Sequence, residues 1–400
     1  KLPDAYAIVN PNQKDCNYPF KGLCGSGVVF KLALAICEKG GFEIDKAWRH
    51  SDIVTLGIAA DLVPIKDENR IIVHRGIQQI EKQTNHGITA LRKTGRLFNK
   101  NITVGRLVFW ITPKINAAGR LGDASRAVKL LITKNPVFAM ELATELEKEN
   151  NRRKEITLQI TREALNMVEI ECDLENEKII VLQKEDWHEG VIGIVASRIK
   201  DIYSRPVIII SMNENQGKGS CRSISGFDIV EALKECNKYL IGFGGHPIAA
   251  GLSINKENYL KFKKKIIKIA DDKISSDKLT PMIYVDAELK LEDVNNRMLK
   301  FLNAMEPYGP GNARPIFISR NLHVDGIPRL IGQDQNTLKV YVKQNKTPYE
   351  SIGFNMAIHY EKLINNASID IAYVIAENEW KGKKSIQLEL KDIKLGSQYA

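Results

Sequence analysis

Two glycine-rich stretches organise this chain: GKGSCRS at residues 217–223 and GFGGHPIAAG at residues 242–251. Glycine lets the backbone turn sharply and brings its N–H groups close to a ligand, which is how proteins hold phosphate. The same stretches carry a hydroxyl, a guanidinium and an imidazole that suit an oxyanion, from Ser220, Arg222 and His246. We therefore predict two phosphate-binding turns. The alternative is a pair of tight surface turns with a structural arginine.

Composition limits what the rest of the chain can be. Four hundred residues exceed one ordinary core, so two or three domains are expected. The sequence has no apolar run of membrane-spanning length and no signal-peptide pattern, which favours a cytoplasmic location without membrane partners. Six cysteines without C-x-x-C spacing indicate reduced thiols. A formal net charge of +10 and a pI near 9.1 favour a polyanionic partner.

Two segments in the first third carry candidate site residues. Residues 53–60, IVTLGIAA, are apolar except for Thr55 and predict a buried strand, and Asp61 follows it directly. Carboxylates at the ends of parallel strands often bind metals, although Asp61 also suits a turn or cap. Small residues followed by Arg120, just before a helix expected at 127–132, suit a guanidinium that is held against phosphate. A surface loop in which Arg120 pairs with Asp123 fits the spacing equally well.

The middle of the chain predicts a long helix and then a second α/β domain. Residues 137–171 contain almost no Gly or Pro and show an apolar stripe, with a polar interruption at 150–154. Some 30 residues of helix span roughly 45 Å, enough to connect two domains. The strands and helices expected after it lie at 179–182, 190–199, 207–210 and 228–236. His188 precedes the first of these helices, where a cap is favoured over a metal or phosphate ligand.

The last third predicts a small β-barrel. Candidate strands lie at 283–287, 315–318, 338–342, 351–354, 369–374 and 386–390, with one helix at 295–305 and a rigid turn at 307–312. Closed barrels of this size bind single strands by stacking bases on aromatic side chains over a basic groove. Residues 380–384, WKGKK, suit a basic hairpin tip or a plain exposed turn.

In combination, these motifs resemble one family. AADLVP at 59–64, NAAGRL at 116–121, WHEGVIGIVASR at 187–198 and the two glycine-rich stretches occur in the order found in the RecJ family. PYGPGN at 307–312 resembles the start of that family's oligonucleotide-binding (OB) domain. RecJ proteins are single-strand-specific 5′-to-3′ DNA exonucleases of the DHH phosphoesterase superfamily, and the resemblance covers essentially the whole chain.

The resemblance implies an α/β fold in four parts. They are a remnant of the DHH-type parallel-sheet catalytic domain (1–136), a connecting helix (137–171), a DHH-associated substrate-binding domain (172–272) and an OB barrel (280–395). It also implies phosphodiester hydrolysis in DNA repair and recombination with a pair of Mn²⁺ or Mg²⁺ ions. The implied partners are single-stranded DNA, single-strand-binding protein and a helicase.

The resemblance also implies roles for individual residues. Asp61 matches a metal ligand of the catalytic domain, and His246 matches the histidine that faces the scissile phosphate. The positions that match holders of the 5′-phosphate or nearby backbone are Arg120, Ser220, Arg222 and Gly245.

The family's remaining metal motifs, including Asp-His-His, are not found in this sequence, and the first residue is Lys1. We therefore expect a chain truncated at its N-terminus, with further metal ligands upstream of Lys1, that binds single strands without cutting them. Two alternatives stay open: a non-catalytic strand-binding module, and a small DHH-family hydrolase of oligonucleotides or nucleoside phosphates.

Overall fold

The computed structural model describes residues 3–95, 97–98, 100–121, 123–345, 347–364, 368–380 and 382–395. The chain divides into two compact units. The first contains residues 1–82, 101–108 and 283–400, and the second contains residues 83–100 and 109–282. Among the residues described, no helical segment has the length and apolar character that crossing a membrane requires.

The first unit combines short helices with a barrel. Its helices are α1 (Gly25–Lys39), α2 (Asp45–Trp48), α3 (Ser51–Ala60), α4 (Asp67–Glu81), α6 (Val104–Arg106), α13 (Asn296–Ala304) and α14 (Tyr360–Ile364). Helix α3 packs against α1 and α4, and its Val54, Leu56 and Ile58 are buried. The strand predicted at 53–60 is therefore wrong: this run is a helix. A short, mostly apolar run of this kind fits a buried helix as well as a buried strand.

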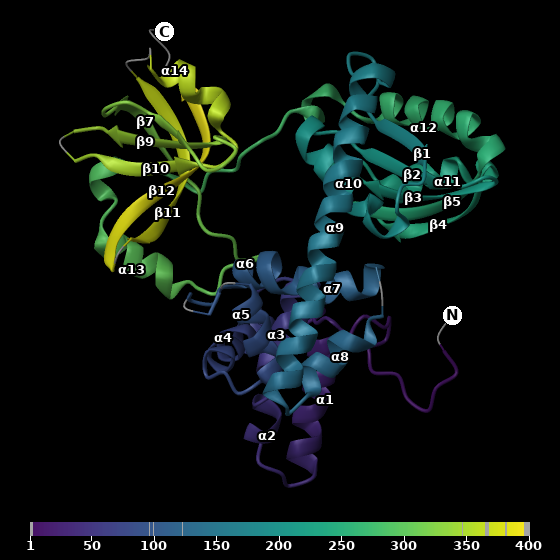
Figure 1. The fold of residues 1–400 in the computed structure, drawn as a ribbon, viewed down its shortest axis with the longest axis horizontal. Coiled ribbons are helices and arrows are strands. Elements are labelled where there is room, and N and C mark those ends of the chain that lie inside the picture. Colours follow the sequence, from purple (N-terminus) through teal and green to yellow (C-terminus); the bar gives the residue numbers. More distant parts are fainter. Residues whose placement is uncertain are drawn as a thin grey trace. The chain divides into compact units, whose positions relative to one another are not determined.

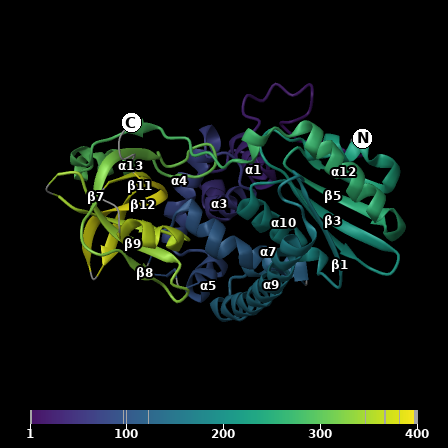
Figure 2. The ribbon, with the colours of Figure 1, turned by 90° about the horizontal axis from the view of Figure 1, so that it is seen from above.

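The strands of the first unit form one sheet that closes on itself (Figures 1 and 2). They are β6 (Ala287–Glu288), β7 (Phe317–Val324), β8 (Arg329–Ile331), β9 (Thr337–Lys343), β10 (Tyr349–Gly353), β11 (Ile369–Trp380) and β12 (Lys383–Leu395). The ring runs β7–β11–β12–β10–β9 and closes because β7 also pairs with β9. The predicted barrel is confirmed, but of the strand predicted at 283–287 only the last residue belongs to a strand, β6.

The turn at 307–312 packs on the loop that follows α3 in the same unit. The backbone N–H of Ile65 donates to the carbonyl of Pro310 over 2.6 Å. A Cβ on Gly309 would lie 2.6 Å from Cγ1 of Ile65, whose side chain is fully buried. The guanidinium of Arg70 donates to the carbonyl of Met305 over 2.9 Å. The predicted rigid turn therefore joins the start of the barrel to the helices.

The second unit contains a helical end and a five-stranded sheet. Its helices are α5 (His86–Thr94), α7 (Thr112–Leu121), α8 (Ser125–Ile132), α9 (Pro136–Glu171), α10 (Glu189–Tyr203), α11 (Ile229–Glu235) and α12 (Tyr259–Lys273). Its strands are β1 (Ile180–Glu185), β2 (Val207–Met212), β3 (Gln216–Arg222), β4 (Leu240–His246) and β5 (Ala249–Asn255). Five-residue π-helix η1 (Leu107–Ile111) and short 3₁₀ turns η2 to η6 (Asn237–Tyr239, Lys256–Asn258, Ser276–Leu279, Leu291–Asp293, Ala357–His359) complete the chain.

The long helix predicted for the middle of the chain is confirmed as α9. The Asn135 side chain accepts from the N–H groups of Val137 and Phe138, and Pro136 opens the helix, which is a favoured start. Its 36 residues span about 54 Å. Helices α5, α7 and α8 pack along α9 toward its start, and α10 packs on its second part (Figure 1).

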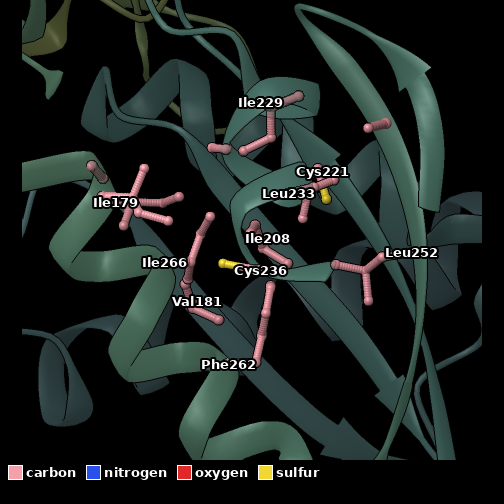
Figure 3. Packing of buried hydrophobic residues seen from close by; sticks show 14 of the residues in the cluster. Ile179, Val181, Ile208, Cys221, Ile229, Leu233, Cys236, Leu252, Phe262 and Ile266 are labelled. Carbon is pink, nitrogen blue, oxygen red and sulfur yellow. The ribbon is translucent and has the colours of Figure 1, made fainter. Parts of the chain in front are cut away.

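The sheet of the second unit has the order β1-β2-β3-β5-β4, with β1 and β2 parallel and the other pairs antiparallel. One face packs on α9 and α10, and the other on α11 and α12. Figure 3 shows this second face, where Ile208, Cys221 and Leu252 of three strands face Phe262 of α12. Alternation along the strands therefore divides their side chains between two cores.

Candidate nucleic-acid interface

The two glycine-rich stretches form neighbouring strands rather than the two turns predicted from the sequence. GKGSCR lies within β3, and the second stretch forms the ends of β4 and β5 with Pro247 and Ile248 between them. Their register brings residues that are far apart in sequence into rows. The rows across β3, β5 and β4 are Lys218–Ser253–Gly242, Ser220–Gly251–Gly244 and Arg222–Ala249–His246. Directly paired residues share a face of a sheet, so these nine residues form one surface.

On this face of the sheet, α10 packs mainly on β2 and β3, and the surface beside it is partly open. The open part is a groove of about 550 Å³. Its lining residues are Glu189, Ile192, Lys218, Gly219, Ser220, Gly242, Phe243, Gly244, Gly251, Leu252 and Ser253. The groove lies wholly within the second unit.

The floor of this groove is bare backbone at three glycines, Gly242, Gly244 and Gly251. A Cβ on Gly242 or Gly244 would meet nothing within 4 Å, and one on Gly251 would meet only the Gly219 carbonyl at 3.8 Å. The fold itself would therefore accept a side chain at each position. Glycine inside a strand costs about 0.5–1 kcal/mol relative to alanine, so these glycines weaken the sheet where its packing does not require them. A floor without side chains lets an extended ligand lie directly on the backbone.

The Arg222 guanidinium is held at the side of the groove by three acceptors. Its Nε donates to Ser197 Oγ over 3.1 Å, and its Nη1 donates to Ser220 Oγ over 3.1 Å and to the Cys221 carbonyl over 2.8 Å. Burial lowers the pKa of Arg222, and the nearby charge of Arg120 lowers it further. Arginine nevertheless stays protonated in proteins. Arg222 is thus a fixed, half-buried positive charge.

Arg120 reaches the same place from α7. Its Nη1 donates to the Gly190 carbonyl over 2.8 Å at the start of α10. The alternative of a surface loop around Arg120 is wrong, because residues 116–121 belong to α7 and Ala117 and Ala118 are fully buried. The alternative pairing with Asp123 is not found either, since Asp123 accepts from Ser125. The structure brings Arg120, Ser220 and Arg222 together.

Gly245 and His246 end β4 beside the last row. Gly245 has φ +148°, and a Cβ there would lie 2.4 Å from the Ala249 carbonyl, so this position requires glycine. His246 is exposed and shares its face with Arg222 across β5. The site therefore has cationic side chains on β3 and an imidazole on β4, with small residues between them.

The WHEG segment shapes the start of α10. His188 caps the helix by accepting from the Gly190 N–H over 3.0 Å, which is the role favoured from its sequence position. Buried Trp187 donates its indole N–H to Glu163 of α9 over 2.9 Å, and this hydrogen bond is the main cause that lowers the pKa of Glu163 to about 2. The contact fixes the segment against α9.

Asp61 belongs to the first unit. It is the exposed C-cap of α3 and precedes Leu62, which has φ +52°. Among the described residues, no group of three or more His, Cys, Asp or Glu side chains could hold a metal ion. The described residues therefore do not fit the pair of Mn²⁺ or Mg²⁺ ions that the resemblance implies. Asp61 is the one ligand proposed from the sequence.

The proposed basic tip between β11 and β12 lies partly outside the described residues. Lys381 and the Trp380 side chain belong to the part that the structure does not describe, and Gly382 has φ +77°. On the barrel, exposed Tyr341 of β9 lies beside Lys339, whose Nζ is 5.7 Å from the ring centroid. This pairing of an aromatic ring with a cation is typical of single-strand-binding surfaces.

Sequence reasoning missed Ser197 and Arg153. Ser197 holds Arg222 from α10. Arg153 lies in the segment interpreted as a polar interruption of the long helix, beside buried Asn150 and Thr157. Polar residues at buried positions of a helical stripe are the signal that could have identified Arg153, because buried polar groups need partners.

Residues 176–275 match the family model of the DHHA1 domain, and residues 285–392 match that of the RecJ OB domain. The single-stranded-DNA-specific exonuclease RecJ of Haemophilus influenzae is 35% identical over 404 residues, which cover 97% of this chain and 70% of the relative. This chain belongs to the RecJ family. The RecJ of Bacillus subtilis is also 35% identical, over 98% of this chain.

The chain spans about half the length of that Bacillus relative, 49%. A crystal structure of Thermus thermophilus RecJ in complex with Mg²⁺ superposes with a TM-score of 0.81 at 27% identity. It covers 94% of this chain and 57% of the Thermus protein. A second structure of that protein, with Mn²⁺, gives a TM-score of 0.82. The α/β class, the DHH-associated domain and the OB barrel are thereby confirmed.

Proposed function

We propose that this protein is a single-stranded-DNA-specific 5′-to-3′ exodeoxyribonuclease that acts in DNA repair and recombination. The observation that carries the proposal is the glycine floor formed by Gly242, Gly244 and Gly251, with Arg222 and Ser220 beside it. The floor lies on β4 and β5, and the cationic side lies on the neighbouring β3, an arrangement that suits one extended polyanionic strand. The formal net charge of +10 supports the same partner.

We propose that the 5′-terminal phosphate binds at Arg120, Ser220 and Arg222. Two guanidinium groups and a hydroxyl provide charge-assisted hydrogen bonds, which are about twice as strong as neutral ones. The strand then lies on the bare backbone next to Gly245, and His246 faces the scissile phosphate. The Ser197 and Gly190 contacts keep the two arginines in position before the strand arrives, which reduces the cost of ordering them.

The domain limits and partners belong to the same proposal. We assign residues 1–136 to the catalytic domain, 137–171 to the connecting helix, 172–272 to substrate binding and 280–395 to the OB barrel. Single-strand-binding protein and a helicase are proposed partners, and the cytoplasm is the proposed location. Retention of either protein on the immobilised chain, in buffer of about 0.15 M salt, would support the proposed partners. If neither protein is retained, the proposed partners are contradicted.

We propose that hydrolysis needs Mn²⁺ or Mg²⁺, the ions named for the Thermus structures. A bound ion of this kind would supply a Lewis acid for the phosphate and would lower the pKa of a water molecule. Asp61 is the ligand assigned from this chain. The residues proposed to bind and orient the strand are Arg120, Ser220, Arg222, Gly245 and His246, and the two arginines also neutralise its charge.

The test of the activity uses the protein at its natural length with strands labelled at the 5′ or the 3′ end. Release of the 5′ label as mononucleotide, abolished by EDTA, is expected. Release of 3′-terminal nucleotides first contradicts the polarity. Tight binding without cleavage in Mn²⁺ would favour the strand-binding module, and cleavage restricted to dinucleotides would favour the small hydrolase. The 400 residues alone are expected to bind without cutting, because the described part gathers no set of metal ligands.

A further inference from the structure

Four arginines lie on four different elements of the second unit: Arg120 of α7, Arg153 of α9, Arg198 of α10 and Arg222 of β3. Arg120 lies near both Arg222 and Arg153, and Arg198 lies near Arg153, so we call these four residues the arginine cluster. Helix α9 packs on both α7 and α10. Hydrogen bonds to Gly190 and Ser197 tie Arg120 and Arg222 to α10, and Arg198 directly follows Ser197.

Arg153 is the least satisfied of the four. Its Nη2 donates to Oδ1 of buried Asn150 over 2.8 Å, but its Nε is buried without a hydrogen-bond partner. An unsatisfied buried donor costs about 1–3 kcal/mol. Burial lowers the pKa of Arg153, and the charges of Arg120 and Arg198 lower it further. The side chain is therefore oriented by Asn150 and charged, and its Nε lacks an acceptor.

The charges of this arginine cluster are not balanced within the described part of the chain. None of the four arginines forms an ion pair with a carboxylate there, whereas Arg126 of the same unit pairs with Glu149 over 2.5 Å. A terminal phosphate monoester carries about −1.5 to −2 charges at neutral pH. Four guanidinium groups carry twice that charge or more, so the terminal phosphate leaves a positive excess at Arg153 and Arg198.

We propose that Arg153 and Arg198 form a second phosphate subsite beside the terminal-phosphate site of Arg120, Ser220 and Arg222. This rests on the proposed function, because the first subsite is part of it. The ligand is a second phosphate group in reach of the first. Its source is either a 5′-terminal di- or triphosphate or the first phosphodiester of the strand, and both present the same anionic oxygens to a guanidinium.

Calorimetry with inorganic pyrophosphate and inorganic phosphate tests the subsite on the 400-residue chain without DNA or metal. Pyrophosphate should bind at least about tenfold more tightly than phosphate, as a second charge-assisted contact predicts. Arg153→Gln keeps an amide donor toward Asn150 but removes the charge. It should abolish this advantage and leave phosphate affinity within about twofold. Equal affinities in the unmodified chain, or an unchanged advantage in Arg153→Gln, overturn the proposal.

The matched control is Arg162→Gln, an exposed position on the same helix that loses the same charge. It should keep the pyrophosphate advantage; if it loses as much as Arg153→Gln, the effect is general charge and the subsite is contradicted. Thermal unfolding of each variant excludes misfolding, and Arg153→Lys should retain part of the advantage.

Short strands identify the source of the second phosphate. If a 5′-triphosphate oligothymidylate loses affinity on Arg153→Gln more than a 5′-monophosphate one, the terminal source is supported. If Arg153→Gln lowers the affinity for a 5′-phosphorylated trinucleotide more than the affinity for a 5′-mononucleotide, the phosphodiester source is supported. Failure of the proposed function gives a different result: the unmodified chain then binds 5′-phosphate and 5′-hydroxyl strands equally, whatever pyrophosphate does.

Discussion

Arg120 and Gly190 hold each other in place. The Arg120 guanidinium donates to the Gly190 carbonyl over 2.8 Å, and the Arg120 carbonyl lies 2.6 Å from where a Gly190 side chain would begin. The end of α7 can therefore approach α10 only because residue 190 has no Cβ. This contact brings the Arg120 charge beside Arg222.

Gly190→Ala should separate the end of α7 from α10 and displace Arg120. We expect a loss of stability of about 1–3 kcal/mol from overpacking. The affinity for 5′-phosphorylated strands should fall as far as in Arg120→Ala, and the double variant should lose little more. Fluorescence anisotropy with labelled strands measures this. Additive losses in the double variant would mean that Gly190 and Arg120 act independently.

Gly244→Val tests whether the glycine floor serves a ligand. Because a Cβ at Gly244 meets nothing within 4 Å, the free energy of unfolding should stay equal or rise by up to about 1 kcal/mol. Strand affinity should nevertheless fall at least about tenfold, since the side chain occupies the groove. Gly245→Ala is the contrast: with φ +148° and a Cβ 2.4 Å from the Ala249 carbonyl, it should destabilise the fold. Unchanged strand affinity in Gly244→Val would remove the groove from the binding site.

Glu163 should make stability depend on pH below about 4.5. The hydrogen bond from Trp187, with that from Lys184, lowers the pKa of Glu163 from 4.5 to about 2. A carboxyl with a depressed folded pKa stabilises the fold above its unfolded pKa, and this contribution is lost as pH falls from 4.5 toward 2. Urea unfolding between pH 6 and pH 3 should show a shallower decline for Glu163→Gln, which keeps an acceptor but cannot titrate. Identical declines for both proteins would refute the assignment.

Gly309 and Ile65 couple the turn at 307–312 to the loop after Asp61 in the first unit. Gly309→Ala should cost about 1–3 kcal/mol because its Cβ would lie 2.6 Å from Ile65 Cγ1. Ile65→Ala removes that atom, so the double variant should lose at least about 0.5 kcal/mol less than the sum of the single losses. Ile65→Val keeps Cγ1, so this control should not reduce the stability loss caused by Gly309→Ala. If both Ile65 variants reduce that loss, or if neither does, the contact between Gly309 and Ile65 is contradicted.

How far the sequence predicts the structure differs from element to element. The start of α9 is predictable because Asn135 and Pro136 are local signals. The sequence does not distinguish helix α3 from a strand, because its mostly apolar run shows no clear period; the packing of α3 between α1 and α4 favours the helix. Glycine suggested a turn at 217–223, but the outward Lys218, Ser220 and Arg222 alternate with inward residues, which is the period of a strand.

The candidate site was predictable by residue type but not by arrangement. Arg222 and Ser220 lie close in sequence, so their association follows from one strand. Arg120 lies far from Arg222 in sequence and joins it through α10, a tertiary contact that no local pattern contains. Arg153 escaped notice because a polar interruption in a helix usually faces solvent. Asn150 beside it is buried in the folded protein, which no local pattern in the sequence shows.

The most direct test of the central claim compares the affinity of the chain for one single strand bearing either a 5′-phosphate or a 5′-hydroxyl, before and after Arg222→Ala. A charge-assisted contact to a terminal phosphate contributes about 1.5–3 kcal/mol, so the phosphorylated strand should bind at least about tenfold more tightly, and Arg222→Ala should remove most of that difference. The affinity for the hydroxyl strand should change little. Equal losses on both strands, with the salt dependence reduced by about one unit, would identify Arg222 as a general backbone contact and contradict the terminal-phosphate site.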